Sequence, residues 1–413
     1  MLGTMTEDHR FLKRARELDA ADRLAPFRAC FVGHDDATVR SYLDGNSLGR
    51  PLQASVERVQ ELMVHQWSGR LIRGWDETWL QLPKSIGDEL GRVALGAAPG
   101  QCIVADSTTV LLYKLARAAI QARPGRNRIV IDRDNFPSDR FIVEGIADEC
   151  GLELDWLEAP QDGGVDAELV RSVVGPDTAL VLLSHVAYRS GYLADMPAIT
   201  QAVHDAGALV LWDLCHSVGI VPVELDAWGV DLAVGCSYKY LNGGPGAPAW
   251  AYVRAEHQHF RQPIQGWIGS AEPFEMGQGY EPAPGIGRFA SGTPPIIGMT
   301  AIQDMVDLIG TAGIQNVRAK SVALTEFAVE VTEELLAGYG VVISSPRDPA
   351  QRGSHITIDH PSFKKLVGRL WDQGIIPDFR EPDGLRLGLS PLSTSFEEVY
   401  VGVAAIQAEL ALG

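Results

Sequence analysis

Lys239 lies in the stretch of this chain whose residue types are best suited to covalent chemistry. An apolar run, 208–212, ends in Asp213, and His216 follows three residues later. A second apolar run leads to Tyr238 and Lys239, and a loop rich in glycine and proline comes next. An acid at the end of one buried strand and a lysine at the end of another are the arrangement that pyridoxal 5′-phosphate (PLP) enzymes need.

Each of these groups has a defined task in that chemistry. The lysine forms an imine with the cofactor and later moves protons, while the carboxylate keeps the pyridine nitrogen protonated so that the ring accepts electrons. The glycines and the proline after Lys239 allow close backbone approach to the cofactor. A lone lysine in such a loop is typically a solvated surface residue. The prediction therefore depends on the combination of Lys239 with Asp213 and His216.

Other polar and aromatic residues follow predicted strands in the same manner. Ligands of open α/β sheets bind beyond the carboxyl ends of the strands. Thr108 and Thr109 lie at the start of a predicted helix. Together with the free backbone N–H groups there, they form either a candidate anion site or a plain helix cap. Phe136 and Asp139 come after the next strand, and Ser184 after another. Phe136 is suited to stacking on a flat ring, although taken singly it also fits a core position.

The elements that must position these residues are predicted to form an open, doubly wound α/β domain. Apolar strand-like runs alternate with helical stretches, as in a largely parallel sheet covered by helices on both faces. The run 152–157 instead alternates apolar and acidic residues, which suits a strand with one face towards water. The strand candidates are Cys102–Ala105, Arg128–Ile131, Leu152–Leu157, Ala179–Leu183, Leu209–Trp212, Leu232–Val234 and Ala249–Val253.

We expect three parts along the chain. Residues 1–60 form an N-terminal arm that contributes to a small domain, residues 61–300 form the large PLP-binding domain, and residues 301–413 form the small α+β domain. A long helix starting at Ile297 leads out of the large domain, and an amphipathic helix, 316–337, follows it. The strand candidates of the small domain are Val341–Ser344, His355–Asp359 and Leu385–Leu389.

Composition and charge limit the classes of partner. The 413 residues are 46% hydrophobic with a formal net charge of −18, which argues against nucleic acid or an anionic membrane as partner. The five cysteines are widely spaced without a C-x-x-C pair, so we expect reduced thiols and neither disulfides nor a metal site. The N-terminal segment lacks the apolar region of a signal peptide, and no apolar run is long enough to span a bilayer. We expect a soluble, cytoplasmic protein.

The order of its motifs makes the chain resemble the kynureninases, in the aminotransferase class V branch of the fold-type I PLP enzymes. The resemblance implies an aspartate-aminotransferase-like fold, with a mostly parallel, seven-stranded type of sheet and a smaller α+β C-terminal domain. The matching motifs span nearly the whole chain. They are YLDGNSLG (42–49), LIRGW (71–75), VADSTTV (104–110), RDNFPSD (133–139), HVAYRSG (185–191), WDLCHSVG (212–219), GCSYKYLNGGPG (235–246), GWIGSAEPFEM (266–276), SGTPP (291–295) and PDFREPDGLRLGLSPL (377–392).

The resemblance implies the cofactor contacts. Lys239 would hold PLP as an imine, Asp213 would pair with the pyridine nitrogen, and Phe136 would stack on the ring. Thr108 and Thr109 would bind the phosphate or atoms flanking the ring. The remaining cofactor contacts implied within one subunit are Asp139, Ser184, His216 and Tyr238.

The resemblance also implies how an amino-acid substrate is held. Arg386 would bind the α-carboxylate through a bidentate fork, with Ser47 nearby. Tyr238 is a candidate general acid as well as a cofactor contact. Trp267 and Thr293 would reach in from the neighbouring subunit, so a homodimer with a shared active site is implied.

For a kynureninase, the implied reaction is hydrolysis of the Cβ–Cγ bond of kynurenine or a 3-substituted kynurenine, giving an anthranilate and alanine. Four positions depart from the bacterial pattern: Leu111 and Ala187 stand in place of asparagine, Ser270 of histidine and Ser393 of tyrosine. The alternative is therefore a PLP-dependent C–S β-lyase, or a decarboxylating or oxidatively deaminating tailoring enzyme acting on a cysteine S-conjugate or another bulky amino acid.

Overall fold

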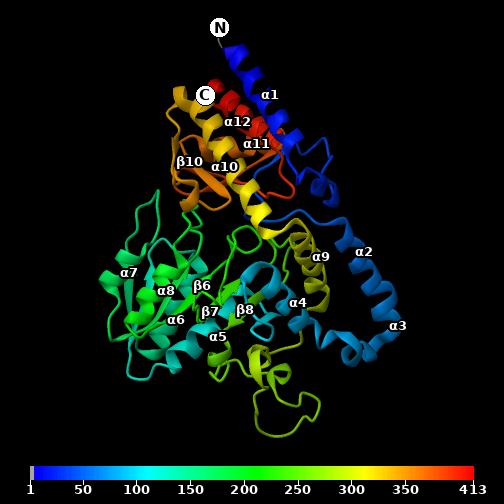
Figure 1. Ribbon diagram of the computed structural model, residues 1–413, viewed down its shortest axis with the longest axis vertical. Coiled ribbons are helices and arrows are strands. Elements are labelled where there is room, and N and C mark those ends of the chain that lie inside the picture. The colour runs from blue at the N-terminus through cyan, green and yellow to red at the C-terminus, as the bar shows by residue number, and fades with distance from the viewer. Residues whose placement is uncertain (1–3) are drawn as a thin grey trace.

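Two sheets of different size divide the protein into a large and a small lobe. The computed structural model describes residues 4–413, which contain a seven-stranded sheet, a four-stranded sheet and a two-stranded pair. Figure 1 shows the small lobe above the large sheet, with both ends of the chain in the small lobe. The long helices α9 (Ile296–Ala312) and α10 (Ile314–Leu336) run from one lobe into the other.

The large sheet is mostly parallel, as predicted. Strand β8 is antiparallel to both of its neighbours, β2 and β7, and the remaining pairs are parallel. All seven predicted strands are present, and the alternating run 152–157 forms the edge strand β4. In spatial order the strands are β2 (Cys102–Ala105), β8 (Ala249–Val253), β7 (Leu232–Gly235), β6 (Leu209–Asp213), β5 (Thr178–Ser184), β3 (Arg128–Asp132) and β4 (Glu153–Leu157).

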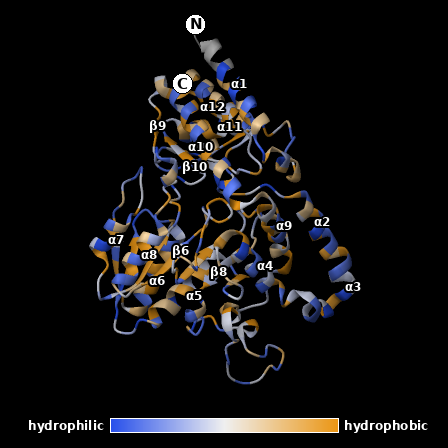
Figure 2. Cartoon of the chain, viewed as in Figure 1, coloured by the Kyte–Doolittle hydropathy of each residue, from blue (hydrophilic) through white to orange (hydrophobic). Residues whose placement is uncertain are grey.

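Both faces of this sheet are buried because successive residues of its central strands enter two separate cores. In β6, Val210 and Trp212 pack into one core while Leu209 and Leu211 pack into the other. Figure 2 shows the resulting hydrophobic centre of the large lobe. Helices α5 and α6 cover one face, and α4, α7, α8 and α9 cover the other. Their bounds are α4 (Leu82–Leu90), α5 (Thr108–Gln121), α6 (Pro137–Cys150), α7 (Ala167–Val173) and α8 (Met196–Asp205).

The small lobe is an antiparallel sheet whose two faces differ in polarity. Leu385 and Leu387 of β13 point into an apolar core, so Arg386 between them lies on the opposite face. Strand β12 was not predicted, because three residues with two charges give little apolar signal. The sheet order is β12 (Asp378–Arg380), β13 (Gly384–Gly388), β10 (His355–Asp359) and β9 (Val342–Ile343); the two-stranded pair is β1 (Ser41–Tyr42) with β11 (Ile375–Ile376).

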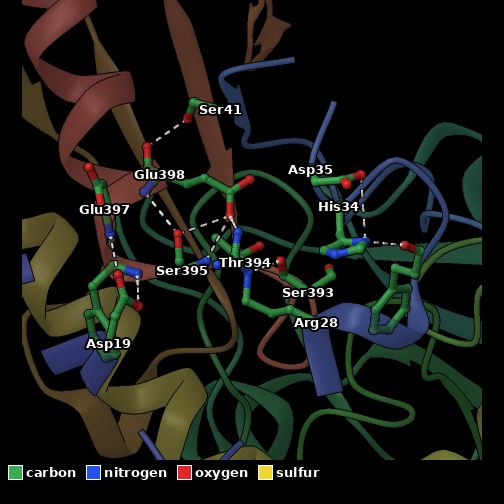
Figure 3. Close-up of polar contacts among 12 residues, drawn as sticks. Asp19, Arg28, His34, Asp35, Ser41, Ser393, Thr394, Ser395, Glu397 and Glu398 are labelled. Atoms are coloured by element: carbon green, nitrogen blue, oxygen red, sulfur yellow. Dashed lines mark hydrogen bonds and ion pairs between the residues drawn. The ribbon is translucent and has the colours of Figure 1, made fainter. Parts of the chain in front are cut away.

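The N-terminal arm is bound to the start of the last helix. Ser395 and Glu398 form a capping box, and the Asp19 carboxylate accepts hydrogen bonds from the backbone N–H groups of Phe396 (2.9 Å) and Glu397 (3.0 Å) (Figure 3). These contacts satisfy N–H groups that a helix start leaves without partners. The helices of the arm and small lobe are α1 (Thr4–Ala21), α2 (Gln53–Glu61), α3 (Ser68–Arg70), α11 (Phe363–Asp372) and α12 (Phe396–Leu412).

The arm therefore belongs with the small lobe for part of its length. Ser41 and Tyr42 pair with Ile375 and Ile376, whereas α2 packs on α9. The domain boundaries at residues 60 and 300 remain predictions. In the part of the chain that the structure describes, no helix is both long and apolar enough to cross a lipid bilayer.

Candidate active site

The carboxyl ends of neighbouring strands bring the predicted site residues together. Ser184 is the last residue of β5 and Asp213 the last residue of β6, and the two are paired in the parallel register. Lys239 follows the adjacent strand β7 after a short turn. Phe136 reaches the same edge from the loop after β3, because Pro137 both keeps it extended and starts α6.

The Lys239 amine is buried against aromatic and imidazole rings. The residue is 6% exposed, and its Nζ lies 3.1 Å from His216 Nε2. The same nitrogen lies 5.4 Å from the ring centroid of Phe136 and 5.8 Å from that of Tyr238. An ammonium has only hydrogens to offer, so a charged Lys239 donates to His216. The Phe136 ring is thus placed to stack on a flat ring whose aldehyde reaches the Lys239 amine.

Lys239 differs from the other buried lysines in its lack of an acid partner. Lys114 forms an ion pair with Asp106 at 2.5 Å, and Lys320 forms one with Asp22 at 2.6 Å. Among the ion pairs of residues 10–413, none involves Lys239. A nearby carboxylate favours the charged form of a lysine. Lys239 is therefore the buried amine that the fold leaves available for condensation with a carbonyl group.

His216 is held in its neutral form. Burial lowers its pKa most, and the positive charges of Lys239 and Arg386 lower it further. A neutral imidazole has one nitrogen free to accept a hydrogen bond. His355, whose ring centroid lies 5.9 Å away, has a pKa lowered to about 3, first by burial and then by Arg386. The two imidazoles therefore add no positive charge beside Lys239.

Two buried carboxyl groups lie side by side beneath the site. Asp213 Oδ1 accepts a hydrogen bond of 2.7 Å from the backbone N–H of Cys215. Asp139, in the first turn of α6, has a pKa raised well above its usual value, first by burial and then by the negative charge of Asp213 and a hydrogen bond to it. Asp139 Oδ2 is buried without another partner. Burial beside Asp213 therefore favours the protonated form of Asp139, and an acid at the position of Asp213 suits a protonated ring nitrogen.

The start of α5 provides a second feature that fits a phosphorylated cofactor. Helix α5 starts at Thr108, and the Ser107 hydroxyl accepts only a long bond, 3.4 Å, from the backbone N–H of Val110. Free N–H groups and hydroxyls at a helix start bind anions. Thr109 is exposed and Thr108 half-buried, so both are open to a ligand. The residues present fit PLP, with Lys239 and Phe136 at the aldehyde and ring.

Ser184 meets the site through Asn135 rather than directly. Its hydroxyl donates a hydrogen bond of 2.6 Å to Asn135 Oδ1, which also accepts from the backbone N–H of Phe136 at 2.7 Å. Asn135 Nδ2 is buried with no hydrogen-bond partner among the residues that the structure describes. Sequence reasoning did not single out Asn135, although it lies within the motif that contains Phe136. Its free donor adds a polar group beside the candidate cofactor site.

Ser47 and Arg386, 339 positions apart, meet at the other side of the site. Arg386 Nη2 donates to Ser47 Oγ at 2.9 Å, and Nη1 donates to the backbone carbonyl of Tyr188 at 2.8 Å. The Nε edge of the guanidinium donates to Asp378 Oδ2 at 2.8 Å, and Nη2 contacts the same oxygen. Arg386 is 1% exposed. The structure thus joins both predicted substrate-binding residues and adds Asp378, which was not predicted.

Comparison with known proteins agrees with this arrangement. A family model described as the kynureninase C-terminal domain matches residues 317–406. A kynureninase of Pseudomonas fluorescens is 39% identical over 394 residues, covering 94% of this chain and 92% of that protein. A kynureninase of Burkholderia pseudomallei (strain 1106a) is 40% identical over 403 residues, covering 96% and 94%. The chain belongs to the kynureninase family.

Solved structures share the fold of this kynureninase family member. A cysteine desulfurase from Thermococcus onnurineus NA1 superposes with a TM-score of 0.82 at 18% identity, covering 94% of this chain and 98% of that one. The cystine C-S lyase C-DES, in complex with cysteine persulfide, gives a TM-score of 0.80 at 18% identity, covering 91% and 99%. These structures confirm the predicted fold-type I, class V architecture.

Two predicted cofactor residues of this kynureninase family member lie elsewhere. Trp267 belongs to the segment between β8 and α9, which projects from the large lobe on the side away from the small lobe (Figure 1). Thr293 is exposed and lines an apolar hollow of about 400 Å³ together with Trp67 and Trp75. Within residues 4–413, no recorded contact joins Trp267 or Thr293 to Lys239. Their role as contacts from a second subunit remains a prediction.

The four departures from the bacterial kynureninase pattern lie in different surroundings. Leu111 is fully buried in the core beneath α5, and Ser393 is buried near the start of α12. Ala187 lines a cavity of about 10 Å³ together with Asn135 and Tyr188. The Ser270 hydroxyl donates to the Trp267 carbonyl at 3.0 Å. Ala187 is therefore the departure that adjoins the residues gathered around Lys239.

Proposed function

We propose that this chain is a PLP-dependent hydrolase that cleaves the Cβ–Cγ bond of kynurenine or a 3-substituted kynurenine, releasing an anthranilate and alanine. The 39–40% identity with two kynureninases over nearly the whole chain supports this reaction. The observation that carries the proposal is the buried Lys239 amine, which lies 3.1 Å from a neutral His216 and has no acid partner among residues 10–413. That amine is suited to covalent chemistry with an aldehyde.

The residues at the end of the large sheet would hold the cofactor. Bound PLP supplies an aldehyde and a ring that accepts electrons from the substrate. Lys239 Nζ would bind the aldehyde and, after displacement by the substrate amine, take and return protons. Phe136 would cover one face of the ring, and Asp213 would face the ring nitrogen with the proton-bearing Asp139 behind it. Thr108 and Thr109 would bind the phosphate.

Tyr238 would stay protonated at neutral pH. Burial raises the pKa of its phenol most, and the neighbouring Cys236 and Cys215 thiols raise it further. Its ring lies 5.8 Å from Lys239 Nζ, so the phenol and the amine border the same space. Two groups in one place can serve as acid and base for successive proton transfers. Tyr238 is the proposed acid, and Lys239 the proposed base.

The test separates cofactor attachment from the reaction. Borohydride reduction of the holoenzyme followed by peptide mapping should place the pyridoxyl group on Lys239. Kynurenine and 3-hydroxykynurenine should then yield an anthranilate, measured by fluorescence, and alanine in equal amounts. A labelled Lys239 without anthranilate, together with thiol release from cysteine S-conjugates, would support the β-lyase instead. A label on another amine would refute the proposal.

The proposal includes a homodimer whose second copy completes the site. An apolar strip after the arm, in residues 62–73, is exposed in one copy, with Ile72 77% and Trp67 50% exposed. It continues into the apolar hollow lined by Trp75 and Thr293. Large exposed apolar patches are typical of interfaces. Because Thr293 lies in this patch, covering it with a second copy would bring Thr293 towards that copy's site, as the family resemblance implies.

Replacing two exposed side chains tests the dimer. Trp67→Asp with Ile72→Asp should convert the protein from dimer to monomer, measured by sedimentation, and lower cofactor affinity at least tenfold because Thr293 no longer reaches a neighbouring site (about 1.4 kcal/mol). The matched control is Phe141→Asp with Val342→Asp, since both residues are exposed outside this strip. A monomeric wild type, or a monomeric variant with unchanged cofactor affinity, would contradict the shared site.

We also propose a cytoplasmic location. The five cysteines, Cys30, Cys102, Cys150, Cys215 and Cys236, are all unpaired. Free thiols are typical of proteins in a reducing compartment. Cell fractionation should find the chain with cytoplasmic marker enzymes, and recovery in an exported fraction would contradict the location.

A further inference from the structure

Asp44 adjoins the candidate carboxylate site from the N-terminal arm. The arm segment 42–49 meets β13 through a bridge between Asp44 and Gly388, with the Gly45 N–H donating to the Gly388 carbonyl at 3.2 Å. Ser47 lies one turn after Asp44, since its backbone N–H donates to the Asp44 carbonyl at 3.0 Å. Asp44 is half-buried, and its Oδ1 is buried with no hydrogen-bond partner in the described part of the chain. The carboxyl group thus stands beside the Ser47–Arg386 contact.

The charges of this cluster balance without a substrate. Two acids, Asp44 and Asp378, face two guanidinium groups, Arg386 and Arg380, and Asp378 pairs with both of them. A substrate α-carboxylate would add a third negative charge without a third cation. The charged and titratable groups that face Asp44 from the arm, β12, β13 and the turn after Lys239 are Tyr42, Asp378, Arg380, Arg386 and Tyr240.

Ser47 has a single hydroxyl hydrogen, which either Asp44 or the substrate carboxylate can accept. Its oxygen accepts from Arg386 Nη2 at 2.9 Å, and its hydroxyl acts as a donor that lowers the pKa of the neighbouring Asp44 carboxyl. A serine hydroxyl has one hydrogen to donate. It therefore can donate to Asp44 or to a substrate carboxylate, but not to both. If Ser47 donates to the substrate, Asp44 loses its hydrogen bond unless it carries a proton of its own and donates that proton to Ser47 Oγ.

We propose that Asp44 is a positioning residue that takes up one proton from solvent when the substrate α-carboxylate binds Arg386 and the Ser47 hydroxyl. In the bound state the Asp44 carboxyl donates to Ser47 Oγ, and Ser47 donates to the substrate. The uptake restores the charge balance. The negative charge of the substrate carboxylate replaces the negative charge that Asp44 loses when it is protonated. The inference rests on the proposed role of Arg386 but not on the hydrolysis step.

The raised pKa of Asp44 agrees with proton uptake at this residue. Burial raises the pKa of Asp44 to about 6, with the Ser47 hydrogen bond opposing the rise and the charge of Asp378 adding to it. At pH 7.5 the free carboxyl is therefore mostly ionised. A substrate that removes the Ser47 hydrogen bond and adds a negative charge raises the pKa again. Binding then draws a proton from the solution.

A substrate analogue without an amino group provides the test. 3-Benzoylpropionate carries an aryl ketone and a carboxylate but cannot react at Lys239. Titration calorimetry of the holoenzyme at pH 7.5, in buffers of different ionisation enthalpy, should show uptake of about one proton per site. Its affinity should fall about tenfold between pH 6.5 and 7.5, because proton uptake opposes binding as the pH rises.

Two variants decide the outcome. Asp44→Asn should bind the analogue with proton uptake near zero and a change in affinity of less than about twofold over that range. Ser47→Ala keeps the acid but removes the link, so its uptake should be clearly smaller than that of the wild type. Equal proton uptake in wild type and both variants, or failure of the wild type to bind the analogue, would overturn the proposal. Proton uptake without anthranilate formation would instead contradict only the proposed hydrolysis.

Discussion

Lys239 and Arg386 are both buried cations of the candidate active site, but the fold surrounds them in opposite ways. Lys239 has a neutral imidazole 3.1 Å from its amine and forms no ion pair with any of residues 10–413. Arg386 has Asp378 along one edge of its guanidinium and Ser47 and the Tyr188 carbonyl along the other. Among residues 10–413 the lysine therefore has no ion-pair partner, whereas a carboxylate, a hydroxyl and a carbonyl fix the direction of the arginine.

The difference follows from what each group must do in the proposed reaction. An amine attacks an aldehyde only in its neutral form, so an adjacent acid would oppose the chemistry. A receptor for a carboxylate needs the reverse: a permanent charge whose hydrogens already point at the ligand. The other two buried lysines, Lys114 and Lys320, resemble Arg386 in having acid partners. Burial alone therefore does not distinguish the reactive amine. What distinguishes Lys239 is that it has no acid partner among the described residues.

The largest expected effect is at Lys239. Lys239→Ala should lower kcat/KM for kynurenine by about a thousandfold or more, because the covalent attachment and the proposed base are both lost. Anthranilate fluorescence measures the rate, and borohydride labelling measures attachment. Lys114→Met is the matched control: it removes a buried lysine with an acid partner, so it should lower Tm while the label stays on Lys239. Normal turnover by Lys239→Ala would show that Lys239 is not the reactive amine.

A smaller effect is expected at Arg386. Arg386→Lys should raise KM by about 10- to 100-fold with a lesser change in kcat, since a charged hydrogen bond contributes about 1.5–3 kcal/mol and an ammonium cannot replace the fork. Arg380→Lys is the control, because Arg380 Nε also contacts Asp378, at 2.8 Å, without reaching Ser47. Its KM should change less than about threefold. Equal effects of the two replacements would show that Arg386 contributes only charge.

The sequence predicted the region around Lys239 far better than the region around Arg386. All seven strands of the large sheet are continuous or alternating apolar runs, and Asp213 and Ser184 stand directly at their ends. Parallel strands bring such ends together, so short motifs locate the site. The proximity of Lys239 to His216 and Phe136 follows from the order of the strands.

The carboxylate site depends instead on contacts between distant parts of the chain. Ser47 and Arg386 were predicted from the family resemblance, but no local pattern shows that Asp44 and Asp378 flank them. Asp378 lies in a three-residue strand with little apolar signal, and Asp44 meets β13 only through the folded arm. His355 was predicted as part of a strand, not as a neighbour of His216. Tertiary packing decides each of these contacts.

The smallest effect on catalysis is expected at Asp139. This prediction tests the acids near Lys239 and not the two cations themselves. Asp139→Asn mimics the protonated acid, so kcat should change less than about fivefold, whereas Asp213→Asn removes the charge and should cost about a hundredfold or more. The pKa of Asp139 is raised by burial and by Asp213. An acid with a raised pKa binds more protons when folded, so the unfolding free energy falls as pH rises from its unfolded pKa through the raised one.

Denaturant unfolding of the cofactor-free protein from pH 4 to 8 measures this stability effect. The wild type should lose stability relative to Asp139→Asn as the pH rises, since the variant has no proton to give up at that position. Parallel curves would mean that Asp139 is ionised throughout. Asp139 would then not be the proton-bearing partner of Asp213, and two negative charges instead of one would lie near Lys239, which would weaken the contrast with Arg386.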